Sequence, residues 1–170
     1  MRLARVRLKN FRCYKDEIGI DIGKFTTLVG KNDAGKSTIL DALTIFFDDS
    51  APDADDGSVD GDKRDIRIIC EFEDLPSSLV IDSDHKTDLA AEYLLNEAGR
   101  LEIQKIYDGS LKKPKLLGAY ACALHPTVEG RDDLLTLKNS DLKKRAKELD
   151  VDTSNGKRVR SPIAHMGPED

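Results

Sequence analysis

Residues 25–47 constrain this chain more than any other segment. An apolar and β-branched run, Phe25–Val29, is followed by the pattern G-x-x-x-x-G-K-S over Gly30–Ser37. Apolar residues then recur at three- and four-residue spacing through Lys36–Phe47, without glycine or proline, which predicts a helix that packs on a sheet. We therefore expect a strand buried on both faces in a parallel sheet, then a glycine-rich loop, then a helix.

A loop in this context is typical of phosphate binding, because backbone N–H groups and the helix N-terminus form an anion site. Gly30 and Gly35 would let the backbone wrap a β-phosphate, and Lys36 would place an ammonium on the β/γ oxygens. The Ser37 hydroxyl is placed to ligate Mg²⁺, and Thr38 adds a donor toward the α-phosphate. The predicted cofactors are ATP and Mg²⁺; the alternative is a glycine turn with no ligand. The predicted loop contacts are Gly30, Asn32, Asp33, Ala34, Gly35, Lys36, Ser37 and Thr38.

Two elements, L-K-N-F-R at Leu8–Arg12 and L-V-G-K-N-D-A-G-K-S-T-I-L-D-A at Leu28–Ala42, resemble the N-terminal part of the ABC-type ATPase heads shared by SMC, RecF and OLD proteins. Asp33, where SMC proteins usually carry glycine, makes the chain most similar to the OLD-like branch. Members of that branch often join the ATPase to a Toprim nuclease and act in bacterial DNA processing or phage defence. The resemblance is specific over residues 1–48, looser as far as Asp108, and gives no guidance beyond it.

The resemblance implies an α/β P-loop NTPase fold, the N-terminal lobe of an ABC-type ATPase head, with antiparallel β-hairpins beside a parallel core sheet. It also implies that Asn10, Phe11 and Arg12 lie beside the nucleotide, with Arg12 near its phosphates or base. The alternative for Arg12 is a surface turn residue. Two protomers of such heads sandwich ATP, which implies a homodimer or a partner that supplies the acidic strand and signature motif.

Other strands are predicted from period-two alternation. Ala4–Leu8 and Ile18–Ile22 are expected to form one antiparallel hairpin, and Ile66–Phe72 another strand. Tyr93–Asn96 and Leu101–Tyr107 flank a short loop, which predicts a second hairpin.

Two further local features are predicted, one in the loop of the second hairpin and one near residue 145. Gly99, within that short loop, is expected to have positive φ. Beyond Gly109 the only clear signal is a basic helix over Asp141–Leu149, with Ser140 as its cap.

We expect residues 1–150 to form one ATP-binding lobe and residues 151–170 to be a polar tail that leads into structure outside this chain. The segment 48–62 holds seven aspartates and almost nothing to bury, so we predict a mobile acidic loop. Its spacing does not match an EF-hand, since Ser58 and Arg64 stand where glycine and glutamate are required when counting begins at Asp53.

The net charge of −5 gives no overall field for nucleic acid, so any DNA contact must come from a local patch. The face formed by Arg5, Arg7 and Lys9 could touch a DNA backbone, but we favour a basic guard on an edge strand. The three cysteines show no C-x-x-C spacing, which favours reduced, buried thiols. No apolar run approaches the ~20 residues of a membrane span, and no signal peptide is recognisable, so we expect a cytoplasmic protein.

Hydrolysis needs an acidic group opposite the metal and a positioned water, and the sequence does not supply them clearly. Leu79–Asp82 is the one apolar run that ends in an aspartate, but Ser83 follows it. The catalytic residues are therefore unknown, and we expect this chain alone to bind Mg-ATP with negligible turnover. The alternatives are a non-hydrolysing ATP-gated interaction module and a self-contained small-molecule kinase, which would need its own catalytic acid and basic lid.

Overall fold

The chain divides into two compact units in the computed structural model, which describes residues 1–31, 35–82, 85–125, 133 and 137–151. The first unit joins Met1–Leu75 to Ala98–Cys122, and the second joins Pro76–Glu97 to Ala123–Asp170. The predicted lobe over residues 1–150 thus includes parts of both units, and its unity stays a prediction. Among the described residues, no helix has the length and apolar character needed to cross a membrane.

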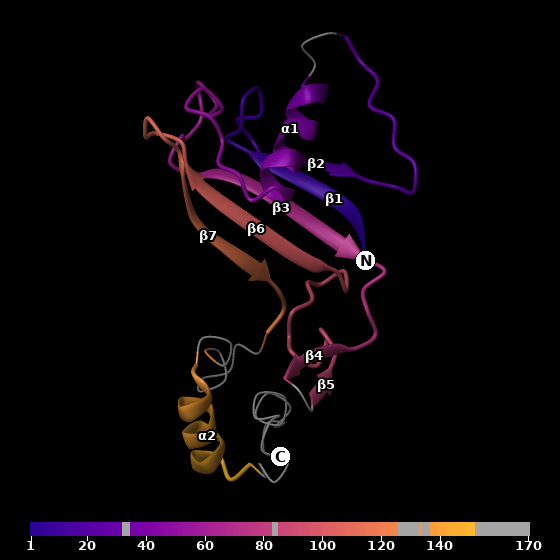
Figure 1. Ribbon diagram of the computed structural model, residues 1–170, viewed down its shortest axis with the longest axis vertical. Coiled ribbons are helices and arrows are strands. Elements are labelled where there is room, and N and C mark those ends of the chain that lie inside the picture. Colours follow the sequence, from indigo (N-terminus) through magenta and orange to yellow (C-terminus); the bar gives the residue numbers. More distant parts are fainter. Residues whose placement is uncertain (32–34, 83–84, 126–132, 134–136, 152–170) are drawn as a thin grey trace. The chain divides into compact units, whose positions relative to one another are not determined.

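A five-stranded antiparallel sheet, in the order β2-β1-β3-β6-β7, forms the first unit (Figure 1). Its strands are β1 Arg2–Lys9, β2 Ile18–Asp21, β3 Ile66–Glu73, β6 Leu101–Asp108 and β7 Lys115–Cys122. The alternation predicted for β1 is confirmed, because Ala4, Val6 and Leu8 are all buried. The first hairpin is confirmed as well, with Val6 opposite Ile20 in the antiparallel pairing of β1 and β2.

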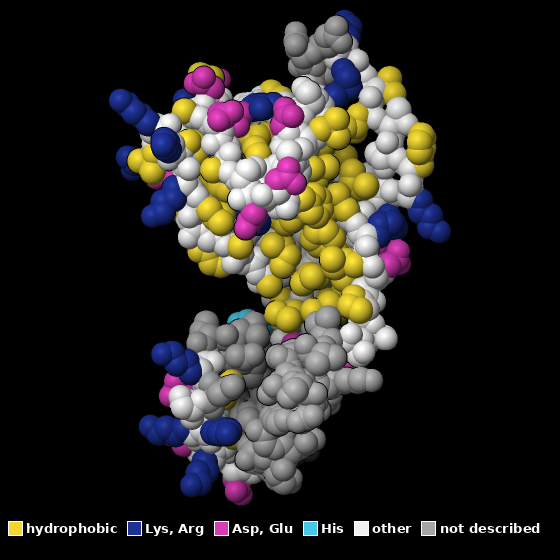
Figure 2. Space-filling model, viewed as in Figure 1, with side chains coloured by type: hydrophobic (Ala, Val, Ile, Leu, Met, Phe, Trp, Pro, Cys, Tyr) yellow, Lys and Arg dark blue, Asp and Glu magenta, His cyan; other side chains and the backbone are white. Residues whose placement is uncertain are grey.

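The helix α1, Lys36–Phe47, has the predicted bounds and packs on one face of the sheet (Figure 1). Its buried apolar side chains are Ile39, Ala42, Ile45 and Phe46, which share the core with β1 and β3. Fully burying a large apolar side chain is worth about 1.5–3 kcal/mol, so this stripe fixes the helix on the sheet. Leu40 and Phe47, which belong to the same apolar spacing, remain 59% and 56% exposed. Hydrophobic side chains gather over this face of the first unit (Figure 2).

Phe25–Val29 does not form the predicted buried strand. The segment has no regular structure, and Phe25 and Val29 are 89% and 88% exposed. A strand needs a hydrogen-bonded neighbour, and the described residues supply none for this segment. The expected parallel core sheet is accordingly not found in the described part of the chain, where every strand pair is antiparallel. The α/β P-loop fold is confirmed without it.

The second predicted hairpin is half right. Leu101–Asp108 is the strand β6, and Gly99 has the expected positive φ of 69°. Tyr93–Asn96, however, is not a strand, and β6 pairs instead with β3 and β7. The sequence did not predict β7, because this edge strand is exposed on both faces and so lacks a clean period-two pattern.

The second unit contains a short hairpin of β4, Leu79–Asp82, and β5, His85–Thr87, together with the helix α2, Asn139–Glu148. The predicted basic helix is confirmed in kind, but Ser140 is not its cap. The helix begins at Asn139 after Lys138, and no side chain caps it. Leu142 and Ala146 are buried in a small apolar cluster of their own. The predicted polar tail, 152–170, lies outside the described residues.

Candidate nucleotide-binding site

The N-terminus of α1 has the features of an anion site. Gly35 is the N-cap residue and has a φ of 78°, a left-handed conformation that favours glycine. Among the described residues, no side chain forms a cap hydrogen bond at this end, and the first turn carries no acidic residue. Within that part of the chain, the first N–H groups of α1 have no side-chain acceptor, and the positive end of the helix dipole lies beside them.

Gly35 is also required by the space around it. A Cβ atom there would meet the hydroxyl of Tyr14 and would lie 2.9 Å from the Cys13 sulfur. The Tyr14 hydroxyl donates to the Gly35 carbonyl oxygen at 3.3 Å. The turn at residues 11–14 thus packs directly against the end of the phosphate loop.

The predicted loop contacts are placed as follows. Lys36 folds over the loop, and its Nζ donates to the carbonyl oxygens of Gly30, at 2.8 Å, and Lys31. Ser37 is exposed on the first turn of α1, where its hydroxyl is accessible, whereas Thr38 is buried. The remaining predicted contacts lie outside the described residues: Asn32, Asp33 and Ala34.

The side chain of Asn10 is hydrogen-bonded to the backbone of Asp62 and Asp65. Its backbone has a φ of 55°, and the residue is buried. The side-chain amide donates to the Asp65 carbonyl oxygen at 2.9 Å, and its oxygen accepts from the Asp62 N–H at 3.1 Å. Both ends of the amide are therefore occupied within the protein. Its predicted role beside the nucleotide is not supported by any contact here and stays a prediction.

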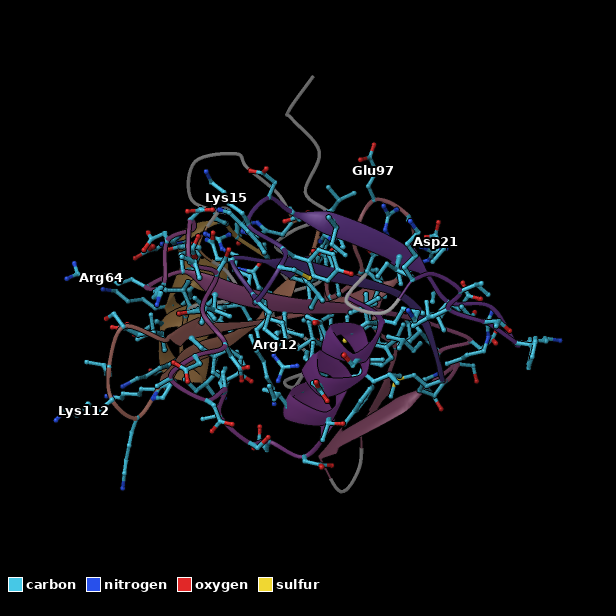
Figure 3. The ribbon with its side chains drawn as sticks, turned by 90° about the horizontal axis from the view of Figure 1, so that it is seen from above. Arg12, Lys15, Asp21, Arg64, Glu97 and Lys112 are labelled. Carbon is cyan, nitrogen blue, oxygen red and sulfur yellow. The ribbon has the colours of Figure 1, made fainter. Side chains whose placement is uncertain are left out.

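Arg12 lies beside α1, as Figure 3 shows. Its Nε donates to the Asp56 carboxylate at 2.6 Å, and its Nη1 donates to Asp41. The hydrogen bond that Arg12 donates to Asp56 is the largest of the effects that raise the pKa of Arg12. Asp41 and Ser37 share one face of α1, because they are four residues apart. Arg12 is thus held on the flank of the helix that carries the predicted metal ligand.

The acidic loop, 48–62, has no helix or strand, as expected, but it is not empty of buried groups. Its buried residues are Pro52, Asp56, Gly57 and Ser58. The Arg12 N–H donates to the Asp56 carbonyl oxygen at 2.7 Å, and the Ser58 N–H donates to Asn10 at 3.0 Å. The expectation that this loop has almost nothing to bury is wrong, since its centre is bound to residues 10–12. Its mobility stays a prediction.

The basic face of β1 is covered by ion pairs. Arg5 lies 3.7 Å from Asp21, Arg7 lies 3.1 Å from Glu17, and Lys9 lies 3.1 Å from Asp65. Arg7 also pairs with Glu71 and Glu102. β1 is an interior strand between β2 and β3, so its interpretation as an edge guard is wrong.

The other candidates have no contact with this site that supports a role in it. Asp82 ends β4, which belongs to the second unit, and its role as a catalytic acid stays a prediction. The described residues contain no group of three or more His, Cys, Asp or Glu side chains that could hold a metal ion. Burial raises the pKa of the Cys70 thiol to about 12, as suits an inert core thiol. Cys13 is exposed, so the expectation of buried thiols is wrong there.

Sequence reasoning missed the acceptors around Arg12. Asp41 was visible only as a polar residue on a helix, and Asp56 as one of many loop aspartates. The one available signal was Asn10, which could indicate a turn before Arg12, since asparagine tolerates the left-handed conformation.

An open helix N-terminus, a left-handed glycine and a lysine folded over the loop define a P-loop nucleotide-binding lobe of the ATPase type. The chain belongs to the AAA ATPase domain family, whose model matches residues 1–161. Together with its nuclease relative, this match identifies the N-terminal region of an ABC-type ATPase head.

That relative is an OLD nuclease of Thermus scotoductus, 46% identical over 50 residues, which are 29% of this chain and 9% of the nuclease. An uncharacterized protein of Methanocaldococcus jannaschii is 27% identical over 135 residues, 66% of this chain and 41% of its own length. The chain therefore spans less than half the length of either relative. A solved structure from work on ATP-driven dimerization and DNA-stimulated activation of SMC ATPases aligns over 96% of this chain and 99% of its own, with 16% identity and a TM-score of 0.45.

Proposed function

We propose that this chain binds Mg-ATP as the N-terminal part of an OLD- or RecF-like ATPase. The observation that carries the proposal is the open N-terminus of α1 after the left-handed Gly35, with no acidic residue in the first turn. An anionic phosphate there would accept from unpaired N–H groups and meet the positive end of the helix.

The side chains around this end suit a triphosphate. The Lys36 ammonium lies on two loop carbonyls, and a phosphate oxygen is the stronger acceptor, so we expect Lys36 to move to the β/γ-phosphates. Ser37 is exposed and would ligate the Mg²⁺ that neutralises those phosphates. Arg12 pairs with Asp41 and Asp56 on the same side, and so would reduce the negative charge near the phosphates; its predicted direct contact with the nucleotide stays a prediction.

For the whole protein, we propose that nucleotide-driven association of two heads is coupled to DNA processing or phage defence in the cytoplasm. Support comes from the relative that is named a nuclease, with 46% identity over 50 residues. The second protomer, or another partner, would supply the acidic strand and the signature motif, and any nuclease activity would lie outside this chain.

A second candidate is a non-hydrolysing, ATP-gated interaction module. It is favoured by one observation on the sequence: Leu79–Asp82 is the one apolar run that ends in an aspartate, and Ser83 follows it in place of a second acid. A self-contained kinase is less well supported, because no catalytic acid is placed beside the phosphate loop in the described residues.

Two measurements on the 170-residue chain test the proposal. Calorimetric titration should show binding of Mg-ATP, and phosphate release at saturating ATP should not exceed that of Lys36→Ala. The groups that position water and stabilise charge are each worth factors of about 10²–10⁴, so their absence leaves a binder. Turnover well above that blank, lost in Asp82→Asn, would show that the chain carries its own catalytic acid. Absence of ATP binding would refute the proposal altogether.

A further inference from the structure

A cluster of basic side chains lies at one end of the sheet of the first unit, where β6 turns into β7. The turn contributes Lys112, Lys113 and Lys115, and the preceding segment contributes Lys63 and Arg64; we call these five residues the hairpin patch. The two segments are joined by a hydrogen bond from the Gly109 N–H to the Lys63 carbonyl oxygen, at 2.7 Å. Figure 3 shows Arg64 and Lys112 projecting on the same side.

The hairpin patch is exposed, and its charges are not neutralised at short range. All five side chains are exposed, and within the described residues none forms an ion pair. Two acids close in sequence to the patch are engaged otherwise: Asp108 accepts from the N–H and hydroxyl of Ser110, and Asp62 accepts from the Arg64 backbone N–H. Arg64 acts on Asp108 only through a longer-range charge interaction.

The patch differs from the basic face of β1, which the sequence makes more conspicuous. There every base has a carboxylate partner, so a polyanion would have to displace formed pairs. Edge protection explains Lys115, which begins the edge strand β7, but not the lysines before it in the turn. In a chain with a net charge of −5, five neighbouring bases that form no ion pair with the described residues represent a separation of charge.

We propose that the hairpin patch binds the phosphodiester backbone of duplex DNA. The inference rests on the proposed role of the whole protein in DNA processing. Four of the five residues are lysines, and lysine is a point-charge phosphate binder, so we expect contacts to phosphates that do not depend on DNA sequence. Contacts of this kind release counterions, and their affinity falls steeply with salt, with dissociation constants on the order of 10⁻⁴–10⁻⁶ M.

The test is fluorescence anisotropy of a labelled DNA duplex titrated with the 170-residue chain at two salt concentrations. The variant Lys112→Glu/Lys113→Glu/Lys115→Glu should bind at least about tenfold more weakly, and its log–log salt slope should fall by about 2.7 for three lost phosphate contacts. The matched control is Lys24→Glu/Lys143→Glu/Lys144→Glu, which changes the net charge equally at exposed positions that form no ion pair with any described residue. The Lys→Gln triple at 112, 113 and 115 repeats the test without charge reversal, should the reversal impair folding.

Equal loss in variant and control, an unchanged salt slope, or no duplex binding by the parent chain would each overturn the inference. Anionic phosphatidylserine vesicles that bind more tightly than the duplex, through the same lysines, would overturn it in favour of a membrane surface. Titration of Mg-ATP into the same variants separates the two proposals. Parental ATP affinity in a variant that loses DNA is expected, whereas duplex binding without any ATP binding would refute only the nucleotide function.

Discussion

The phosphate loop and the turn at residues 10–12 both lie beside α1, and they differ in whether their polar groups are hydrogen-bonded within the protein. In the phosphate loop, the helix N-terminus has no side-chain cap and Ser37 is exposed. In the turn at residues 10–12, the Asn10 amide is bonded at both ends, and Arg12 is held by two carboxylates. Unsatisfied donors cost stability unless water or a ligand meets them, so the first loop is suited to binding. The second is suited to support.

The contrast explains how an acidic chain can present an anion site. Asp41 and Asp56 would repel a nucleotide if they were free, but both are paired with Arg12. The single positive charge of Arg12 therefore offsets part of the negative charge beside α1, while the turn also binds the acidic loop. Substitutions in the phosphate loop should change binding and spare stability, and substitutions in the turn should do the reverse.

The largest expected effect is on ATP binding by Lys36→Ala. The side chain is not part of the core, and its hydrogen bonds to described residues go to loop carbonyls, so its loss removes charge rather than core packing. We expect affinity to fall by at least about 100-fold, near 2.7 kcal/mol, because a charge-assisted contact to phosphate is lost. The free energy of unfolding should stay within about 0.5 kcal/mol of the parent.

Calorimetric titration and urea denaturation measure the two quantities. Ser37→Ala is the control within the loop, since it removes the predicted metal ligand and leaves Lys36 in place. It should weaken binding in Mg²⁺ but change affinity little in EDTA. If Lys36→Ala bound ATP as tightly as the parent, the phosphate loop would not be the binding loop of this comparison.

The next largest effect is the loss of stability in Asn10→Gly. Glycine accepts the φ of 55° at this position, so the substitution isolates the two side-chain hydrogen bonds to the segment at residues 62–65. Leaving buried partners unsatisfied costs about 1–3 kcal/mol, which we expect in urea denaturation. Asn10→Ala should lose more, because alanine is strained at positive φ. Loss of ATP affinity at constant stability would show instead that Asn10 contacts the nucleotide.

A smaller effect is expected for Asp56→Asn, which removes the charge opposite Arg12. The Asp56 carboxylate is buried and also accepts from the Asp53 N–H at 2.7 Å. We expect a loss of about 1–2 kcal/mol in unfolding free energy, discounted for the partly exposed Arg12. Amide exchange should quicken at residues 53–58. The control is Asp55→Asn in the same loop, which is exposed and unpaired among the described residues.

Local signals in the sequence were enough for the bounds of α1, the buried face of β1 and the first hairpin. Each of these elements buries one face, so the spacing of its apolar residues indicates whether it is a helix or a strand. The strand expected at Phe25–Val29 failed for the converse reason. Composition predicts that a strand will be buried, but pairing depends on a neighbour that the described residues do not contain.

The site was predictable in its chemistry and not in its supports. The phosphate loop follows a spacing rule that reflects backbone geometry, so Gly35 could be placed from sequence. Arg12, Asp41 and Asp56 are far apart in the chain and converge only through the turn and the helix. No period or motif encodes such a convergence, and the acidic loop therefore looked like a solvated excursion.

The smallest expected effect is a change in how the free energy of unfolding depends on pH. It concerns Asp65, whose carbonyl oxygen is bonded to Asn10 in the turn at residues 10–12. Burial acts to raise the pKa of this carboxyl, but hydrogen bonds from Arg67 and Lys9 outweigh it, and the pKa lies below its ordinary 3.8. A lowered folded-state pKa contributes stability above the unfolded-state value, and this contribution is lost as pH falls through the folded-state pKa.

Asp65→Asn should therefore cost at most about 1 kcal/mol at neutral pH and flatten the loss of stability between neutral pH and acid. Urea midpoints measured at pH 7, 4 and 3 test this, with Asp55→Asn as the unpaired control. An acid limb as steep in Asp65→Asn as in the parent would show that the ion pairs of Asp65 with Arg67 and Lys9 contribute nothing to the acid sensitivity.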